Sequence, residues 1–214
     1  MIPTIQLYEN AIVGSDQKLL NDIHLPAKNI AIYERDITVL NEELTRLMTE
    51  YVDCQTKGTV AEIITYVSDY FAQNFADCTA LLADIISLVE LFEKTTKATS
   101  LRLLLTTVET NMCRKFHTDI NDLRMLCTYV GPGTLWLPDE AVDYQALKRR
   151  ASDQEVIKEK AQIQQVGTGN IVLLKGALYG NANPILHRSP SIEQRGEKRL
   201  LLRIDTNKFL NIWK

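Results

Sequence analysis

Histidine is scarce in this chain, whose 214 residues include only His24, His117 and His187. The four cysteines form no Cys-x-x-Cys pair, so we expect reduced thiols rather than a disulfide framework. No uninterrupted apolar run approaches the roughly 18 residues of a membrane span. Residues 1–17 lack the basic stretch and apolar core of a secretory signal. These absences predict a cytoplasmic protein with no membrane partner.

An excess of positive charge is also missing. The formal net charge is -3 and the sequence pI is about 5.7, which weighs against a nucleic-acid partner held by bulk electrostatics. The composition, 45% hydrophobic and 24% charged, is that of a globular protein able to bury a core. The length allows one large domain, or one domain with a helical extension.

The first half of the chain has mainly helical periodicity. After a short strand expected near residues 29–35, apolar residues recur every three or four positions between residues 36 and 95. Thr59 and Glu62 have the spacing of a capping box at a helix start, and Asp77 or Thr79 can begin the next helix. These helices are most simply explained by packing, since they carry no set of metal ligands.

From Ser100 onward the pattern becomes that of β-strands, with a turn at Gly131-Pro-Gly133. The expected strands cover residues 101–105, 113–119, 123–129, 134–137, 170–176 and 198–204. The charged residues 151–163 are predicted to form an exposed connection. Helices followed by short strands predict an α+β fold, in which a mostly helical part (1–98) packs on a small β-barrel (99–214).

The short sequence from Cys113 to Asp119 contains a His and an Asp two positions apart. In a strand, His117 and Asp119 would project from the same face. An antiparallel barrel of the jelly-roll type can place His187 beside them. Two His and one carboxylate form the ligand set of many non-haem Fe(II) sites, which leaves coordination positions open. We therefore predict a metal site made by His117, Asp119 and His187.

Two other interpretations of this pattern stay open. Cys113 has the same strand parity as the two residues and could be a fourth ligand, which would favour Zn²⁺ over Fe(II). Alternatively, His117 is a half-buried structural histidine and Asp119 a turn residue without a metal.

Two arginines on the last expected strand are candidates for binding a cosubstrate. Arg199 follows His187 by 12 residues. An arginine inside a barrel is costly unless it meets a carboxylate, and a 2-oxo acid would supply one in a bidentate pair. Arg203 shares the face of Arg199 four residues later and is the substitute candidate.

Four stretches of this chain resemble the bacterial family called domain of unknown function 1826. They are Leu101–Asp119, Arg124–Asp139, Gly169–Gly176, and His187–Pro190 with Arg199–Asp205. The resemblance covers roughly residues 29–206 and carries no established activity. Members of that family are often encoded near zinc-responsive genes and metal-handling GTPases, which implies a role under zinc limitation.

The order of these elements is more distantly similar to the prolyl-hydroxylase branch of Fe(II)/2-oxoglutarate dioxygenases. That resemblance implies a cupin-like double-stranded β-helix in which His117, Asp119 and His187 hold the metal and Arg199 binds 2-oxoglutarate. Tyr129 or Trp136 would line the pocket. Two positions depart from the branch's pattern: Asn170 stands where an Asp is usual, and Arg199 comes one place later after Gly196.

Three functions follow as hypotheses. The first is an Fe(II)/2-oxoglutarate oxygenase that hydroxylates a small molecule or a protein side chain. The second is a non-catalytic, cupin-like protein that binds Zn²⁺ or partners a metallochaperone. The third is an interaction protein whose helical part docks a partner and whose barrel has no chemistry.

Overall fold

The computed structural model describes residues 8–180 and 183–206, and its strands form two sheets. The larger sheet has the strand order β1 (Ala11–Gly14), β2 (Ile30–Tyr33), β8 (Ile171–Lys175), β5 (Leu123–Val130), β10 (Arg199–Thr206), β4 (Leu101–Val108) and β3 (Asp53–Gly58). Its strands pair antiparallel except for β1 and β2, which are parallel. The smaller sheet has the order β7 (Gln164–Gln165), β6 (Leu135–Trp136) and β9 (His187–Arg188).

The two faces of the larger sheet are buried against different partners. Side chains alternate along a strand, so Leu200 and Leu202 of β10 point to one face and Leu201 to the other. Leu201 belongs to a core cluster that also holds Trp136 and Val166, which come from the smaller sheet and its edge. The two sheets therefore pack face to face, and this inner face is where inward-pointing polar residues would meet a bound group.

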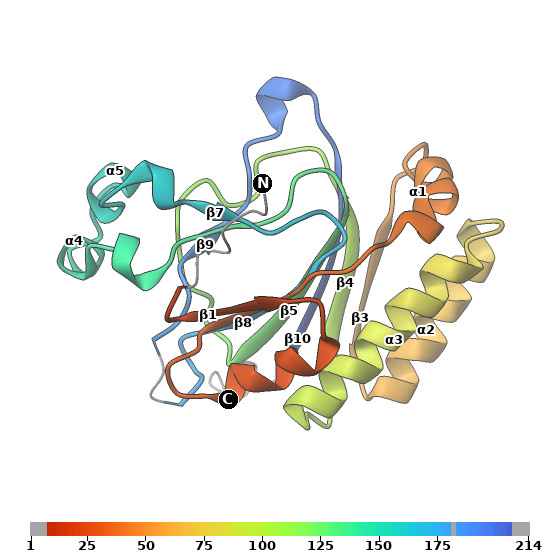
Figure 1. The fold of residues 1–214 in the computed structure, drawn as a ribbon. Coiled ribbons are helices and arrows are strands. Elements are labelled where there is room, and N and C mark those ends of the chain that lie inside the picture. Colours follow the sequence, from red (N-terminus) through yellow and green to blue (C-terminus); the bar gives the residue numbers. More distant parts are fainter. Residues whose placement is uncertain (1–7, 181–182, 207–214) are drawn as a thin grey trace.

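Helices cover the outer face of the larger sheet (Figure 1). They are α1 (Asn41–Leu47), α2 (Val60–Asn74) and α3 (Thr79–Thr96). Ile85 and Phe92 of α3 share one buried cluster with Met125 of β5 and Leu202 of β10. The predicted capping box is present at the start of α2, where Thr59 and Glu62 bond reciprocally.

Several segments differ from the sequence-based expectations. Residues 53–58, placed at the end of a helical stretch, form edge strand β3; only Cys54 in it is buried, so the strand carries almost no apolar pattern. Strand β1 and a 3₁₀ helix (Gln17–His24) lie within the first 28 residues, whose weak sequence pattern predicts no helix or strand. Three strands of the larger sheet thus come from the first 98 residues.

The connection between β6 and β7 is more ordered than its charge suggested. It contains α4 (Tyr144–Lys148) and α5 (Asp153–Val156). Val156 and Ile157 are buried in a third cluster with Phe116 and Leu186, so residues 151–163 are not a wholly exposed loop. These two helices lie on the same side of the molecule as the smaller sheet (Figure 1).

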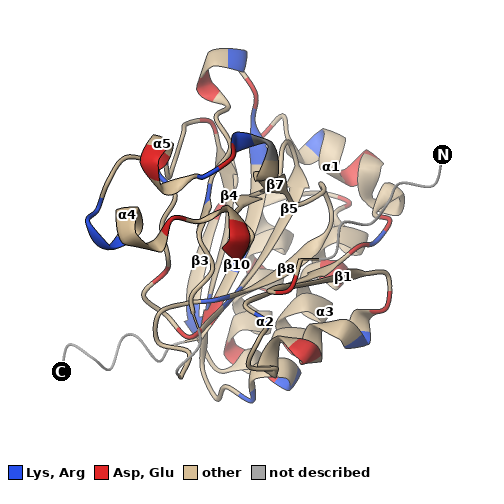
Figure 2. Ribbon diagram, turned by 60° about the vertical axis from the view of Figure 1, so that its left-hand side comes forward, with Lys and Arg blue, Asp and Glu red and all other residues tan. Residues whose placement is uncertain are grey.

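Charge and hydropathy set few further constraints. Figure 2 shows acidic and basic positions interspersed over the helices and loops, in keeping with the formal net charge of -3. Among the described residues, no helix combines the length and the apolar character needed to cross a membrane.

Candidate metal centre

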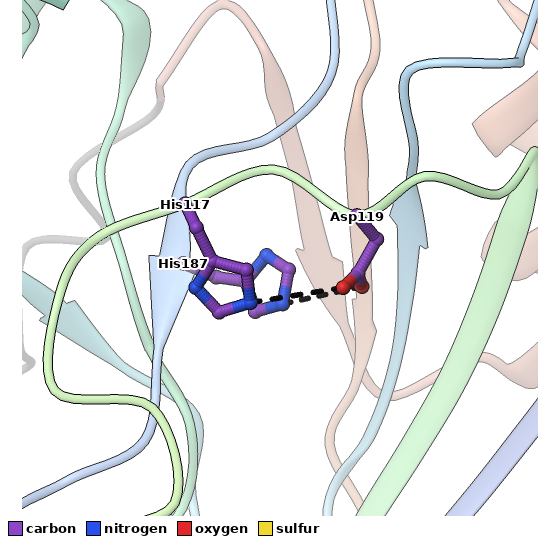
Figure 3. A group of neighbouring side chains, drawn as sticks. All are labelled: His117, Asp119 and His187. Atoms are coloured by element: carbon purple, nitrogen blue, oxygen red, sulfur yellow. Dashed lines mark ion pairs between the residues drawn. The ribbon is translucent and has the colours of Figure 1, made fainter. Parts of the chain in front are cut away.

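His117, Asp119 and His187 lie together, as Figure 3 shows. One possible ligand atom from each residue lies within 4.8 Å of those of the other two. The His187 Nε2 atom is 3.3 Å from Asp119 Oδ2, and the His117 Nε2 atom is 3.7 Å from Asp119 Oδ1. The imidazole rings are tilted by 45° with centroids 4.7 Å apart. The three donors thus converge on one small volume.

Backbone pairing between distant segments brings the two histidines together. His187 is the first residue of β9, and His117 lies opposite it in an isolated antiparallel bridge. Each backbone N–H donates to the other residue's carbonyl at 3.0 Å. The strand expected over residues 113–119 is absent, so this bridge and the following loop place the ligands. The loop is fixed where Ala177 N–H donates to the Asp119 carbonyl at 2.8 Å.

Both imidazoles are oriented by a carbonyl two residues earlier in the chain. The His117 Nδ1 atom is 3.1 Å from the Lys115 carbonyl oxygen, and the His187 Nδ1 atom is 3.3 Å from that of Ile185. An Nδ1–H that donates to a carbonyl leaves the Nε2 lone pair available as a ligand. Both Nε2 atoms are the ones that point toward Asp119 (Figure 3).

The site also favours the protonation states that metal binding needs. Burial lowers the pKa of His117, and the neighbouring His187 adds to that effect. Burial opposes ionisation of Asp119, but its contacts with His187, Arg124 and His117 outweigh that effect and hold the pKa of Asp119 at about 2. A neutral imidazole and an ionised carboxylate are the forms that coordinate a metal.

Arg199 is the second element of the candidate site. It is 1% exposed and lies on the inner face of β10, where its Nη2 donates to Thr128 Oγ1 at 3.0 Å. No ion pair is present for it within the described residues, and its buried Nε has no hydrogen-bond partner. Burial lowers the pKa of Arg199 to about 10. A buried guanidinium without a carboxylate is costly, so this position suits an anionic group of a bound molecule.

Arg203 lies on the same face of β10, as predicted, but is not free of partners. Its Nε is 3.2 Å from Asp205 Oδ2. Tyr129 is not brought to the site. It lies on the outer face of β5, where it is buried among the helices and its hydroxyl donates to Asp84 Oδ2 at 2.6 Å. The inward residue of that strand is its neighbour Thr128, so we assign Tyr129 to the core instead.

Three further residues complete the comparison with the sequence. Trp136 is buried between the sheets, and its ring meets that of Tyr8 edge-on with centroids 5.5 Å apart. Cys113 is half-buried and is not part of the cluster of possible ligands found among the described residues. His24 is exposed and its Nε2 lies 2.8 Å from the Thr95 carbonyl near the end of α3, which is a capping position.

The most extensive ion-pair network at the site was not predicted from the sequence. Arg124 of β5 joins Asp119 to Asp205 of β10. The two aspartates are far apart along the chain, and only the strand register shows that Arg124 and Asp205 face each other. Strand parity alone could have placed Arg124 on the inner face together with Leu126 and Thr128.

A family model matches residues 14–205 under the description "protein of unknown function (DUF1826)". The chain belongs to that family. No curated protein matches it. Among solved structures, the fold is similar to the dioxygenase for auxin oxidation 1 from Arabidopsis thaliana in its 2-oxoglutarate complex. The TM-score is 0.54 at 8% identity, over 92% of this chain and 91% of that one.

Two other solved structures have lower scores. A prolyl-4-hydroxylase from Pseudomonas putida has a TM-score of 0.45 at 10% identity, over 89% of this chain and 97% of that one. A protein of the 2OG-Fe(II) oxygenase family from Caulobacter crescentus has a TM-score of 0.43 at 14% identity, over 92% and 85%. At these identities the likeness concerns the fold, and the chemistry has to be argued from this chain's own residues.

Proposed function

We propose that this protein is an Fe(II)- and 2-oxoglutarate-dependent oxygenase that hydroxylates a small molecule or a protein side chain. The observation that carries the proposal is the convergence of two imidazole Nε2 atoms and one carboxylate on a single point. With three protein ligands, His117, Asp119 and His187, such a site leaves coordination positions open for a cosubstrate and oxygen. The similar fold of a dioxygenase with 2-oxoglutarate supports it.

When bound, iron and 2-oxoglutarate would supply the oxygen activation that amino-acid side chains lack. The chain's own residues do the rest. The carbonyls of Lys115 and Ile185 orient the two imidazoles. Arg199, supported by Thr128, would bind the distal carboxylate of 2-oxoglutarate by charge-assisted hydrogen bonds, with Arg203 as the alternative.

The apolar cluster between the sheets would keep water from the reacting centre. It includes Leu126 and Leu201, which lie on the same inner face as Arg199. A low-polarity surrounding protects reactive intermediates from side reactions. In this proposal Tyr129 has no part.

The proposal extends to the architecture. We interpret the two sheets as the major and minor sheets of a double-stranded β-helix on which α1–α3 pack. Most of its strands lie between residues 101 and 206, and β1, β2 and β3 extend the larger sheet. A cytoplasmic location and a link to zinc limitation stay predictions. A zinc-holding protein would gain from a fourth protein ligand, and Cys113 is not in the ligand group, so we do not favour it.

Metal content and turnover test the proposal. Protein purified without air and loaded with Fe(II) should convert 2-oxoglutarate and O₂ to succinate and CO₂, and without the substrate it should do so when ascorbate is supplied as the two-electron reductant. His117→Ala and His187→Ala should lose both iron and succinate formation. His24→Ala is the matched control and should keep both, because His24 lies outside the ligand group. Loss of iron in the control as well, or its retention in both variants, would reject the site.

A further inference from the structure

Arg124 uses all three of its guanidinium nitrogens on two carboxylates. Its Nε and Nη2 contact Asp205 Oδ1 and Oδ2 at 2.6 and 3.2 Å. Its Nη1 lies 2.5 Å from Asp119 Oδ2. A bidentate pair fixes the plane of a guanidinium, so the pair with Asp205 also fixes the direction in which Nη1 is presented to Asp119.

Asp205 is itself rigidly held. It is 1% exposed and lies directly opposite Arg124 in the register of β10 and β5. The Asn121 side chain donates to its Oδ1 at 3.0 Å, and Asn121 belongs to the same loop as Asp119. This loop lies against Gly176, where a Cβ would clash with the Asn121 carbonyl oxygen. The linked side chains of Asp205, Arg124 and Asp119 therefore connect the sheet to the candidate metal ligand.

The contacts of the two Asp119 oxygens differ. The Oδ2 atom is contacted by Arg124 Nη1 and also lies 3.3 Å from the Nε2 atom of His187, whereas the Oδ1 atom lies 3.7 Å from the Nε2 atom of His117. We propose that Arg124 is a positioning residue that holds Asp119 as a one-oxygen ligand, with Oδ1 directed to the metal and Oδ2 retained by the guanidinium. The inference rests on the proposed function and explains how the carboxylate leaves two coordination positions open for a 2-oxo acid that binds as a bidentate ligand.

A purely electrostatic role and a positioning role of Arg124 predict opposite changes in metal affinity when Arg124 is removed. A guanidinium beside a ligand carboxylate repels a divalent cation, so its loss should tighten metal binding if charge were all that mattered. If Arg124 orients Asp119, its loss should weaken binding, as the loss of outer-shell partners of metal ligands usually does. The sign of the change separates the two roles.

The test is a Mn²⁺ titration of the full chain, followed by 2-oxoglutarate titration at saturating Mn²⁺. Arg124→Gln should weaken Mn²⁺ binding by about 10- to 100-fold. It should also weaken 2-oxoglutarate binding at saturating metal, since a freed Asp119 can occupy a second position. Arg124→Lys keeps the positive charge but lacks the planar guanidinium that makes the bidentate pair, so it should weaken Mn²⁺ binding as well.

Arg35→Gln is the matched control. Arg35, which follows β2, makes a half-buried bidentate pair with Asp84 of α3 on the outer side of the sheet. The Arg35→Gln variant should lower the free energy of unfolding about as much as Arg124→Gln does, without changing the Mn²⁺ affinity. Unchanged or tighter Mn²⁺ binding by a folded Arg124→Gln or Arg124→Lys would overturn the inference, and so would an equal loss in Arg35→Gln. Failure of the unaltered protein to bind Mn²⁺ or Fe(II) would instead reject the proposed function.

Discussion

Asp119 shows how opposing effects at one residue leave a largely buried carboxylate ionised. Burial opposes its charge, but His187, Arg124 and His117 favour it, and the resulting pKa is about 2 against an ordinary value of 3.8. A folded-state pKa below the unfolded one stabilises the protein above pH 3.8, and that stabilisation is lost as the pH falls toward 2.

The free energy of unfolding of the metal-free protein should therefore depend on Asp119 in acid. Between about pH 4 and pH 2 the wild type should lose about 2 kcal/mol more than Asp119→Asn, as urea unfolding at each pH would measure. Asp143→Asn serves as the control, because the pKa of that half-buried helix-cap carboxyl is lowered by backbone hydrogen bonds outside the site. Parallel curves for the wild type and Asp119→Asn would contradict the account.

Single residues differ in how far the sequence determines their role. The scarcity of histidine and the two-residue spacing of His117 and Asp119 were enough to predict that these residues and His187 lie together. The roles of Arg124 and Thr128 depend on which strands are neighbours, and that information is spread over the whole sheet. Tyr129 shows how easily the face of a strand residue is predicted wrongly, because a shift of one position moves a side chain to the other face of the sheet.

At the scale of elements, a half-buried ionic cluster links α3 to the sheet in addition to the apolar contacts of that helix. Arg35 pairs with both oxygens of Asp84, and Tyr129 donates to Oδ2 of the same carboxylate. Arg35 also donates to the carbonyl of Gly169, so the cluster joins α3 to the loop that precedes β8. Removing the carboxylate would leave a buried guanidinium without its counter-charge.

Asp84→Ala should lower the free energy of unfolding by about 3 kcal/mol, because breaking one side of a buried ion pair costs more than the pair contributes. Glu109→Gln removes the Glu109–Lys198 pair, whose two side chains are about half exposed, and should change stability by less than about 1 kcal/mol. Urea denaturation of both variants gives the comparison. Equal losses would show that burial does not govern these ion pairs.

The Gly131 turn links the element scale to the site. Gly131 has φ +81°, and a Cβ there would clash with the Lys198 carbonyl oxygen and lie 2.9 Å from Arg199 Cγ. Gly196 has φ +61° with open space around it. Gly196→Ala should cost about 1 kcal/mol, from the left-handed backbone alone.

Gly131→Ala should cost at least about 1 kcal/mol more, because the added methyl must displace backbone. It should also weaken 2-oxoglutarate binding through Arg199. Thermal unfolding and 2-oxoglutarate titration of both variants test the difference. An equal cost in the two glycine variants would mean that the close approach has no energetic effect.

The elements themselves were predictable where apolar periodicity is strong. Helices α2 and α3 and strands β4, β5, β8 and β10 have dense apolar patterns, and each was expected near its observed position. Edge strand β3 is polar and owes its conformation to pairing with β4, which no local pattern reports. The bridge of His117 with His187 likewise depends on two segments that meet only in the folded chain.

At the scale of the whole molecule, an α+β fold of helices and a large antiparallel-rich sheet agrees with the expectation from the sequence. The expectation failed to include strands from the first 98 residues in that sheet. Those strands form both edges of the larger sheet. Both halves of the chain therefore contribute strands to the sheet that carries the candidate site.

We predict that this fold binds Fe(II) and 2-oxoglutarate at one site. The most direct measurement is the visible absorption of the protein with Fe(II) under anaerobic conditions, before and after addition of 2-oxoglutarate. We predict a charge-transfer band that appears only when both are present, and that is absent in His187→Ala. Iron binding with no spectral response to 2-oxoglutarate, or a band that survives in His187→Ala, would contradict the account.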